Sequence, residues 1–599
     1  MLDELVRTGV VAPDRAESVR RARKRSGAEL AGILLQRRLA GPEEIARARA
    51  EVLGVQWADL AVHPPDRRLL DTLGTTQAIR LGVVPWRRLG RATLIVAPSR
   101  ALFEAALPAL EAAFGRCHLA IAEAEAITAA ILAQKRVSLT RLAETRVPLL
   151  DSCRALFQSR WEGLVVALAV GLPLALVFAG GPLLLIATGW AVLTLLATAA
   201  LKLAAALHAL LPAARAPADL RELTTATLPR ISILVPLYQE TDIARHLLAR
   251  LQKLNYPRDR LEVILVTESE DFTTRDTLAA TPLPHWFRQI TVPPGRVKTK
   301  PRALNFALDH CRGTIVGVYD AEDAPEPDQL LHVAGGFAHA ASDVACLQGR
   351  LDYYNPDQNW LSRCFTMEYA AWFRVVLPAL AAFRLPVPLG GTTLFFRRAA
   401  LEELHGWDAH NVTEDADLGL RLTRRGYRTE LIDTVTYEEA NCWAWPWVRQ
   451  RSRWLKGYAL TYAAHMRRPA ALWSDLGPWG FLGVQLIFLC TLSQFLLAPV
   501  LWSFWFILLG WGHPLLPFLP EGAFAWLIGL FLGSEVIGFS LVALGLRRTR
   551  HRGLWRWMPL LLVYFPLGTA AAYKAAAEVI GKPYYWDKTV HGAALAPES

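Results

Sequence analysis

Short apolar runs recur between about residues 229 and 470, and each of them ends in polar or acidic residues. Examples are ISILVPLY, LEVILVTES and TIVGVYDAED, which are separated by segments with a helical pattern. Strands that alternate with helices in this way are typical of an α/β domain with a largely parallel sheet. Ligands of such sheets bind at the carboxyl ends of the strands, so we expect a site where these runs end.

Five other apolar runs are much longer. Two of them, Trp161–Phe178 and Pro182–Leu211, precede the α/β segment, and three follow it, at Phe481–Leu509, Phe524–Leu546 and Trp557–Tyr573. A helix of about 20 apolar residues is long enough to cross a bilayer. The pattern therefore predicts a multi-pass membrane protein in which the α/β domain is inserted between membrane helices.

Basic residues flank the first pair of long runs on both sides, and they are most frequent in the loop Arg547–Arg552. Because positively charged flanks stay in the cytoplasm, we expect the α/β domain on the cytosolic side of the inner membrane. Three further crossings would leave the end of the chain outside, although we expect the segment GKPYYWDKTVHG to meet the cytosolic site. One of the last three runs is therefore expected to be re-entrant or interfacial.

The N-terminal region contains a weak internal repeat followed by a small α/β unit. TGVVAPDRAESVRRARKRSG is echoed by RRLAGPEEIARARAEVLG, and each copy predicts a helix that starts near Pro13 or Pro42. Residues 55–135 contain strand-like ATLIVAP and HLAIAE around a helical stretch from Phe103 to Phe114. We therefore predict a small N-terminal α+β domain.

With 599 residues the chain is too long for a single core, and 53% hydrophobic against 20% charged residues suits a membrane protein with large soluble parts. The net charge of +11 comes from dispersed arginines, so we expect anionic lipid headgroups and a phosphorylated substrate as partners, and no nucleic acid. Seven widely spaced cysteines without a CxxC pair indicate neither a zinc site nor a disulfide framework.

The boundaries that we expect are 1–135 for the N-terminal domain, 136–160 for a linker, 161–211 for two transmembrane helices, 229–470 for the α/β domain, 471–580 for the membrane or interfacial helices and 581–599 for the tail.

Charged residues gather where the predicted strands end. Asp320 and Glu322 follow the third strand in the segment DAED, where carboxylates can hold a hard divalent cation, although acidic residues after strands are more often solvated. Glu268 ends the preceding strand and can accept hydrogen bonds from a base or ribose. Lys300, in KTKPRALN, can neutralise phosphate, or it belongs to a solvated basic loop. Asp415, in the segment TED, is the candidate general base.

A helix is predicted through QRSRW, with Pro446 in its first turn. On this helix Gln450, Arg453 and Trp454 stand at i, i+3 and i+4, so an amide, a guanidinium and an indole share one face. That face can bind a phosphate and stack a ring. Taken alone, the motif is more typical of an Arg/Trp-rich helix that lies along a membrane surface.

Seven segments occur in the order found in the processive family 2 glycosyltransferases, the membrane-embedded synthases related to cellulose and hyaluronan synthases. They are VPLYQE, KTKPRALNFAL, YDAED, the Gln348-Gly349-Arg350 segment, GGTTLFFR, TED and QRSRW, and the resemblance covers residues 229–460. It implies a GT-A-like fold and an inverting hexosyltransferase that uses a nucleotide sugar, with a UDP-linked hexose such as UDP-glucose as the expected donor. The implied product is a β-linked exopolysaccharide, which the protein passes through its own helices.

The resemblance also assigns the residues at the strand ends to the donor. Glu268 corresponds to a residue that contacts the nucleotide. Asp320 and Glu322 correspond to the family's DxD pair, which binds the nucleotide and a Mg²⁺ or Mn²⁺. Because Glu322 stands where relatives have Asp, the motif leaves open whether Glu322 or Asp323 reaches the metal.

By the same resemblance, Asp415 is the catalytic base with Glu414 beside it, Gln450 and Arg453 contact the diphosphate, and Trp454 forms the floor for the acceptor sugar. An acceptor hydroxyl that Asp415 deprotonates attacks the anomeric carbon from the face opposite the nucleoside diphosphate, so an α-linked donor gives a β-linkage. The C-terminal segment WDKT resembles segments that help close the site in this family.

The N-terminal region resembles the N-terminal domain of type II secretion ATPases, a module that binds cyclic di-GMP in some relatives. Those relatives begin each copy with Arg-Leu-Gly and close it with Gln, whereas Glu29-Leu30-Ala31 and Leu2-Asp3 stand at these starts here. Docking of a protein partner, or dimerisation, is therefore favoured over binding of cyclic di-GMP.

Two other functions are compatible with the sequence. One is transfer of a single sugar to a lipid carrier, and the other is an inactive membrane scaffold or nucleotide receptor. The QRSRW motif favours polymer synthesis over the first, and the intact Asp320 and Asp415 argue against the second.

Overall fold

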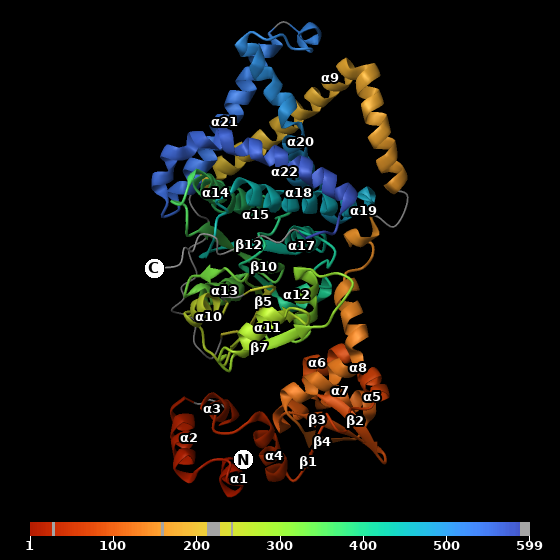
Figure 1. Cartoon of the computed structure of the whole chain (residues 1–599), viewed down its shortest axis with the longest axis vertical. Helices are drawn as coiled ribbons and strands as arrows, with labels where there is room; N and C mark the ends of the chain where they lie inside the picture. Colours follow the sequence, from red (N-terminus) through yellow and green to blue (C-terminus); the bar gives the residue numbers. More distant parts are fainter. Residues whose placement is uncertain (27–29, 157–160, 212–227, 241–242, 521, 587–599) are drawn as a thin grey trace.

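A computed structural model of the chain places three parts along one long axis (Figure 1). The N-terminal domain lies at one end, the α/β domain lies in the middle, and the apolar helices lie at the other end. The predicted class, an α/β domain inserted between apolar helices and preceded by a small α+β domain, is confirmed. The structure describes residues 1–26, 30–156, 161–211, 228–240, 243–520 and 522–586.

A sheet of eight strands forms the centre of the α/β domain, in the order β7-β6-β5-β8-β11-β10-β12-β9. The first four run parallel, β11 is antiparallel to both β8 and β10, β12 is parallel to β10, and β9 is antiparallel to β12. The sheet is therefore parallel in its first half, as predicted, and mixed in its second half. The strands are β5 (Ile231–Leu237), β6 (Leu261–Glu268), β7 (Phe287–Val292), β8 (Ile315–Val318), β9 (Ala324–Pro325), β10 (Val344–Tyr353), β11 (Leu394–Arg397) and β12 (Arg428–Glu438).

Alternate residues of the central strands pack into two separate cores. Leu234 of β5 belongs to a buried cluster with residues of α12 (Lys300–Leu308). Its neighbour Ile233 belongs to another cluster, with α10 (Ile243–Gln252) and α13 (Gln329–His339). Because side chains of a strand alternate between its two faces, continuously apolar strands bury both faces and hold the sheet between helices.

The remaining helices of this domain lie around the sheet and beside the apolar end. They include a π-helical turn, η3, that joins two α-helices in one continuous rod. The helices are α11 (Phe272–Ala279), α14 (Trp360–Ala371), η3 (Trp372–Val376), α15 (Leu377–Ala382), α16 (Arg398–Glu403), α17 (Glu414–Arg424) and α18 (Ala444–Met466).

In its described residues, the N-terminal domain consists of four helices followed by a unit with a four-stranded sheet and four further helices. The predicted helix starts at Pro13 and Pro42 are confirmed, since α2 and α4 begin at these residues. The sheet has the order β1-β4-β3-β2, and β3 and β4 are the two strands expected from the sequence. The elements are α1 (Leu2–Arg7), α2 (Pro13–Ser26), α3 (Leu30–Gln36), α4 (Pro42–Leu53), β1 (Gln56–Trp57), α5 (Arg67–Leu73), α6 (Thr75–Leu81), β2 (Val84–Leu89), β3 (Ala92–Ala97), α7 (Arg100–Phe114), β4 (Cys117–Ile121) and α8 (Ala124–Thr145).

Helix α8 runs past residue 135 into the segment that the sequence predicted as a linker. Leu139 and Ala143 stand one helical turn apart, and both are buried in the core that contains α12. The apolar face of α8 is thus covered by the α/β domain, and the charged residues between its apolar positions gave the appearance of a linker. The N-terminal domain is consequently joined to the α/β domain by a packed helix.

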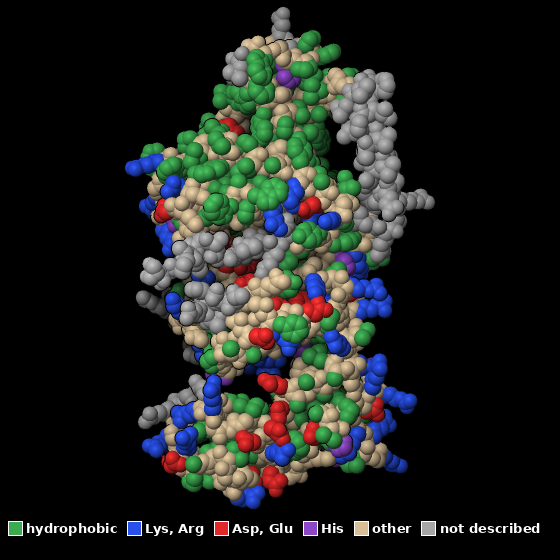
Figure 2. Space-filling model, in the orientation of Figure 1, with side chains coloured by type: hydrophobic (Ala, Val, Ile, Leu, Met, Phe, Trp, Pro, Cys, Tyr) green, Lys and Arg blue, Asp and Glu red, His purple; other side chains and the backbone are tan. Residues whose placement is uncertain are grey.

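Four helical segments among the described residues are long and apolar enough to cross a membrane. They are Gly180–Leu210, Pro469–Ile507, Ala523–Arg547 and Arg552–Gly581. Apolar side chains dominate the surface over this end of the molecule in Figure 2. The predicted crossing Trp161–Phe178 falls in the first part of α9 (Trp161–Leu210), but its side chains lie outside the described residues.

The last apolar helix differs in direction from its neighbours. In Figure 1, α22 (Leu561–Gly581) lies across the molecule alongside α18, whereas α20 (Thr491–Trp502) and α21 (Ala523–Arg547) rise away from the α/β domain. This placement favours α22 as the interfacial run expected from the sequence. It also returns the following residues to the α/β domain. The other elements here are α19 (Pro469–Val484), η4 (Gln485–Cys490), η5 (Ser503–Leu509), η6 (Leu516–Phe518) and η7 (Arg552–Leu560).

The contact between α18 and the loop before α17 leaves no room for a side chain at Gly457. A Cβ atom added there would lie 1.9 Å from Thr413 Oγ1. We expect Gly457→Ala to force the helix and the loop apart and to destabilise the protein by about 1–3 kcal/mol, measured as thermal unfolding in detergent. At Gly553 an added Cβ would meet no heavy atom within 4 Å, so Gly553→Ala is the control. Equal melting temperatures for both variants would contradict the tight contact.

Candidate active site

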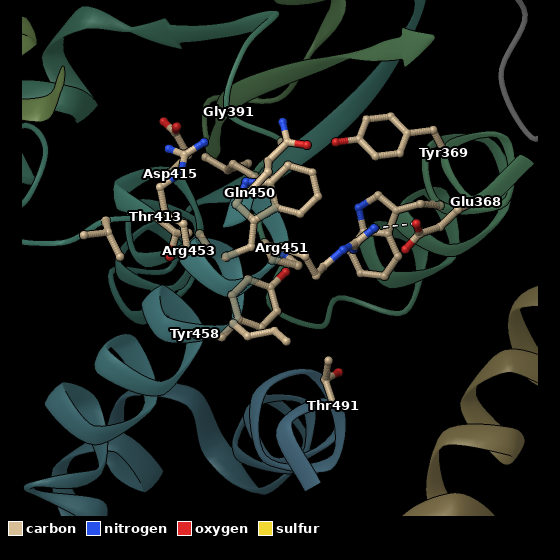
Figure 3. A pocket seen from close by; sticks show the side chains of 18 of the residues that line it. Glu368, Tyr369, Gly391, Thr413, Asp415, Gln450, Arg451, Arg453, Tyr458 and Thr491 are labelled. Carbon is tan, nitrogen blue, oxygen red and sulfur yellow. Dashed lines mark hydrogen bonds and ion pairs between the residues drawn. The ribbon is translucent and has the colours of Figure 1, made fainter. Parts of the chain in front are cut away.

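A cavity of about 910 Å³ opens where the strands of the α/β domain end, and it continues between the apolar helices. The end of β6, the loop after β8, the first turn of α17 and one face of α18 contribute to its wall. All nine residues predicted for the site line it, namely Glu268, Lys300, Asp320, Glu322, Glu414, Asp415, Gln450, Arg453 and Trp454. We call the part lined by Glu268, Lys300, Asp320 and Glu322 the donor end. Figure 3 shows several of the other residues from close by.

Lys300, the first residue of α12, lies among the carboxylates of the cavity. Its Nζ is 2.7 Å from Asp320 Oδ1 and donates a hydrogen bond of 2.9 Å to the Gly391 carbonyl oxygen. Burial lowers the pKa of Lys300, but the carboxylates of Asp320, Asp415 and Glu414 outweigh this effect and raise the pKa above its ordinary value. The ammonium group therefore stays charged and offsets part of the negative charge around it.

The donor end also presents oxygen ligands suited to a divalent cation. Asp320, Glu322 and Glu438 line the cavity, whereas Asp323 is fully buried and accepts hydrogen bonds from the Thr392 hydroxyl and the Asp320 N–H. Glu322 rather than Asp323 therefore faces the cavity. The described residues contain no group of three or more ligands that could hold a metal by themselves. A Mg²⁺ site made of one or two carboxylates together with substrate phosphates fits this arrangement.

Asp415 combines burial with an open hydrogen-bonding position. It lies in the first turn of α17, is 5% exposed, and its Oδ1 has no hydrogen-bond partner among the described residues. Burial and the neighbouring Glu414 raise the pKa of Asp415 well above its ordinary value, and the positive charge of Lys300 opposes them. A buried carboxylate with an unoccupied oxygen and a raised pKa is suited to accept a proton from a bound hydroxyl.

Helix α18 presents the face that the sequence predicted. Gln450, Arg453 and Trp454 all line the cavity, so the expected grouping of an amide, a guanidinium and an indole is present. Arg451 has a different role, because its Nη2 forms an ion pair with Glu368 of α14 (Figure 3). The guanidinium group of Arg451 is therefore engaged by Glu368.

Aromatic rings surround Arg451 and fix its position. Its guanidinium carbon lies 4.7 Å from the ring centroid of Trp454 and 4.9 Å from that of Trp447. Glu368 accepts a second hydrogen bond from the hydroxyl of Tyr564, which also accepts one from the indole N–H of Trp447. This network ties α18 to α14 and α22, and it holds the indole of Trp454 at the cavity wall.

The segment that follows α22 closes one side of the cavity. Tyr584, Tyr585 and Trp586 line the wall, as expected for the C-terminal end. Lys456 Nζ donates a hydrogen bond of 2.7 Å to the Tyr585 carbonyl oxygen, and Arg453 lies 5.7 Å from the ring centroid of Trp586. Asp587–Thr589, the rest of the predicted WDKT segment, lie outside the described residues.

Several cavity residues were not predicted as site residues from the sequence. Glu438 ends β12, a strand in which polar residues are frequent, and its position at a strand end was the available signal. Lys202, Gln494 and Glu535 come from the apolar helices. Charged or amide side chains within apolar runs commonly mark functional positions, and that rule would have found them.

The comparison with known families agrees with this geometry. A sequence profile of the family described as "Glycosyltransferase like family 2" matches residues 229–457. The match includes all eight strands of the sheet, the segment TED and the QRSRW part of α18. The chain therefore contains a family 2 glycosyltransferase domain, and its fold is GT-A-like, as predicted.

Individual proteins give partial matches. The chain is 30% identical to the probable glycosyltransferase YdaM of Bacillus subtilis over 234 residues, which are 38% of this chain and 55% of that protein. It is 28% identical to the beta-monoglucosyldiacylglycerol synthase of Synechocystis over 397 residues, which are 62% and 77% of the two chains. The mannosyltransferase PcManGT from Pyrobaculum calidifontis, solved with GDP-Man and Mn²⁺, is similar with a TM-score of 0.42 and 18% identity over 65% of this chain and 99% of that one. The chain thus spans about half the length of the first relative.

The raised pKa of Asp415 predicts an acidic limb in the dependence of turnover on pH. The deprotonated carboxylate is lost as the pH falls through the raised pKa, so we expect kcat to fall with a midpoint above the ordinary value of 3.8. The affinity for a nucleoside diphosphate should change less over the same range. A limb centred at the ordinary value in steady-state assays would contradict the burial of this carboxylate.

The bond from Lys456 to Tyr585 predicts that this lysine holds the aromatic segment in place. Lys456 is fully buried and also pairs with Glu578 at 2.9 Å. We expect Lys456→Met to destabilise the protein by about 1–3 kcal/mol and to speed amide exchange in Tyr584–Trp586. The exposed Lys253→Met serves as the control. Unchanged exchange in the segment would show that other contacts hold it.

Proposed function

We propose that this protein is a membrane-bound inverting glycosyltransferase that polymerises a nucleotide-linked hexose into a β-linked exopolysaccharide and passes the product through its own helices. A UDP-linked hexose such as UDP-glucose is the expected donor, and the domain is expected to work at the cytosolic face of the inner membrane. The observation that carries the proposal is the single cavity, which joins the donor end to Asp415, to Trp454 and to the apolar helices.

The donor binds at the strand ends in this proposal. Glu268 contacts the nucleotide, while Lys300, Gln450 and Arg453 are placed around the position of the diphosphate. A bound Mg²⁺ or Mn²⁺, held by Asp320 and Glu322, would supply further positive charge there. Hydrogen-bond donors and positive charges that are already in position around a developing negative charge usually contribute most to stabilising the transition state of such a reaction.

Transfer of the sugar then depends on removing the proton of the acceptor hydroxyl and on holding the acceptor sugar in position. The acceptor sugar stacks on Trp454, and its hydroxyl gives a proton to Asp415 with Glu414 alongside. The hydroxyl oxygen forms a bond to the anomeric carbon as the bond to the diphosphate oxygen breaks on the opposite face. Attack from the opposite face inverts the configuration, so an α-linked donor gives a β-linked product.

The membrane-level part of the cavity supports elongation of a sugar chain. Its wall combines the hydrogen-bonding side chains of Gln494 and Glu535 with the rings of Phe495, Trp502 and Phe539. Hydroxyl groups bind to polar side chains, and the apolar faces of sugars stack on aromatic rings. The same wall is compatible with a lipid acceptor, because it lies between helices that are apolar enough to contact a bilayer.

Transfer of one sugar to a lipid is therefore the second candidate. It is favoured by the match to the beta-monoglucosyldiacylglycerol synthase, which extends over 77% of that relative. An inactive scaffold or nucleotide receptor is the third. The N-terminal domain is proposed to dock a protein partner, and cyclic di-GMP is the alternative ligand for it.

The decisive experiment measures nucleoside diphosphate release by the protein in lipid nanodiscs. UDP-glucose and other UDP- and GDP-linked hexoses are offered with Mg²⁺ or Mn²⁺. We expect release with one donor, and about a 10²–10⁴-fold lower rate for Asp415→Asn, because the general base is removed. The exposed Asp276→Asn in α11 is the matched control and should keep the wild-type rate.

The product distinguishes the candidates. A growing polymer that a β-glycosidase degrades supports the synthase, whereas a single organic-soluble glycolipid favours transfer to a lipid. Absence of release with every donor, together with intact nucleotide binding, would support the receptor and exclude both transferase proposals.

A further inference from the structure

The N-terminal domain reaches the donor end of the cavity through the last turns of α8. This helix packs against α12, the helix that begins with Lys300. Asn305 of α12 donates a hydrogen bond of 3.0 Å from Nδ2 to the Ala143 carbonyl oxygen, and Arg146 Nη2 lies 2.9 Å from Asp309 Oδ1. The end of α8 is therefore fixed to the element that positions a donor-end residue.

Glu144, the residue after Ala143, points into the α/β domain. Its side chain is 9% exposed, and its Oε1 accepts hydrogen bonds from the backbone N–H groups of Arg296 at 2.6 Å and Val297 at 3.4 Å. These residues belong to the loop 293–299, which leads directly into Lys300. One carboxylate of the N-terminal domain thus anchors the loop that precedes the first turn of α12.

The same carboxylate faces Arg302, which is fully buried. Arg302 Nη1 lies 3.7 Å from Glu144 Oε1, while Arg302 Nη2 lies 2.5 Å from Glu268 Oε2 and donates a hydrogen bond of 3.0 Å to the Pro293 carbonyl oxygen. Glu268 lines the cavity. The guanidinium group of Arg302 therefore stands between a carboxylate of the N-terminal domain and a carboxylate of the donor end.

Close packing around this pair leaves it little freedom to rearrange. A Cβ atom added at Gly295 would lie 1.9 Å from Arg302 Nη1 and 2.3 Å from Glu144 Oε1. Removing the Glu144 carboxylate would take away one of the two carboxylates that face Arg302, together with the acceptor of the loop hydrogen bonds, and the remaining groups would then shift to find new partners. Here such a shift would move Glu268 and the loop 293–299 together.

We propose that Glu144 is a positioning residue for the donor end, through which the N-terminal domain sets the affinity of the catalytic domain for its nucleotide-sugar donor. The proposal rests on the proposed function for the donor, but its contacts do not depend on which hexose is used. Glu144 does not contact the donor itself. It acts through Arg302 on Glu268 and through the loop 293–299 on Lys300, so displacement of α8 weakens donor binding.

The test compares Glu144→Gln and Glu144→Ala in the full-length protein with Glu125→Gln, an exposed residue at the start of the same helix. We expect about tenfold weaker binding of UDP or GDP, whichever nucleotide the wild type binds, and a similar rise in the donor KM for Glu144→Ala. The effect of Glu144→Gln should be smaller, because its amide oxygen can still accept the loop hydrogen bonds. The kcat value should stay within about twofold of the wild type.

Two further measurements separate positioning from a merely structural role. Amide exchange in residues 293–299 should be faster in Glu144→Ala and unchanged in Glu125→Gln. In a Glu268→Gln background, Glu144→Gln should change nucleotide affinity less than twofold, because the residue through which it acts has lost its charge.

Each outcome decides the proposal. Unchanged nucleotide affinity and KM in both Glu144 variants would overturn it, and so would a loss of melting temperature without any change in KM or affinity. A wild type that binds nucleotide without turnover would refute only the proposed function. The role of Glu144 would still be tested by the measurements of nucleotide binding and amide exchange. A wild type that binds no nucleotide would overturn both.

Discussion

The ammonium group of Lys300 lies 2.7 Å from Asp320 and close enough to Glu414 and Asp415 for their charges to raise its pKa. These carboxylates come from two distant segments of the chain, the loop after β8 and the first turn of α17. They can lie close together around one cavity because a fixed positive charge lies between them. The substrate expected here is itself an anion, so the cavity has to bind negative charge beside its own acidic wall. We therefore expect Lys300 and Arg453 to be as necessary to the proposed donor site as the carboxylates of the sequence motifs.

Helix α18 connects this charged region to the apolar part of the molecule. One face carries Gln450, Arg453 and Trp454 toward the cavity, and the helix also packs along α22. Arg451 links α18 to α14, because its guanidinium is enclosed by rings and paired with Glu368. Taken alone, the QRSRW motif is typical of a helix at a membrane surface. In this structure the helix that carries it connects the catalytic domain to the apolar helices.

Much of the fold and of the cavity wall could be predicted from the sequence. Apolar runs that end in acids identified β5, β6 and β8, and the i, i+3, i+4 spacing placed three side chains of α18 on one face. Other features depend on partners that are distant in sequence. The apolar positions of α8 are covered by α12, so this helix resembled a charged linker, and Glu144 had no local signal of a role. The direction of α22 likewise follows from its packing against α18, since its length and composition suit a crossing equally well. Glu438 was not predicted as a site residue because polar and apolar residues are mixed along β12, which weakens the strand pattern.

The aromatic segment Tyr584–Trp586 follows the last apolar helix, yet it forms part of the cavity wall, and the hydroxyl of Tyr584 donates a hydrogen bond to the carbonyl oxygen of Cys153. A ribosome makes Cys153 and the catalytic domain long before it makes these aromatic residues. The cavity is therefore complete only after every apolar helix has been synthesised and α22 has come to rest against α18. In this order of events, correct placement of α22 against α18 is a condition for assembling the site, so a chain that stalls before Tyr584 lacks one of its walls.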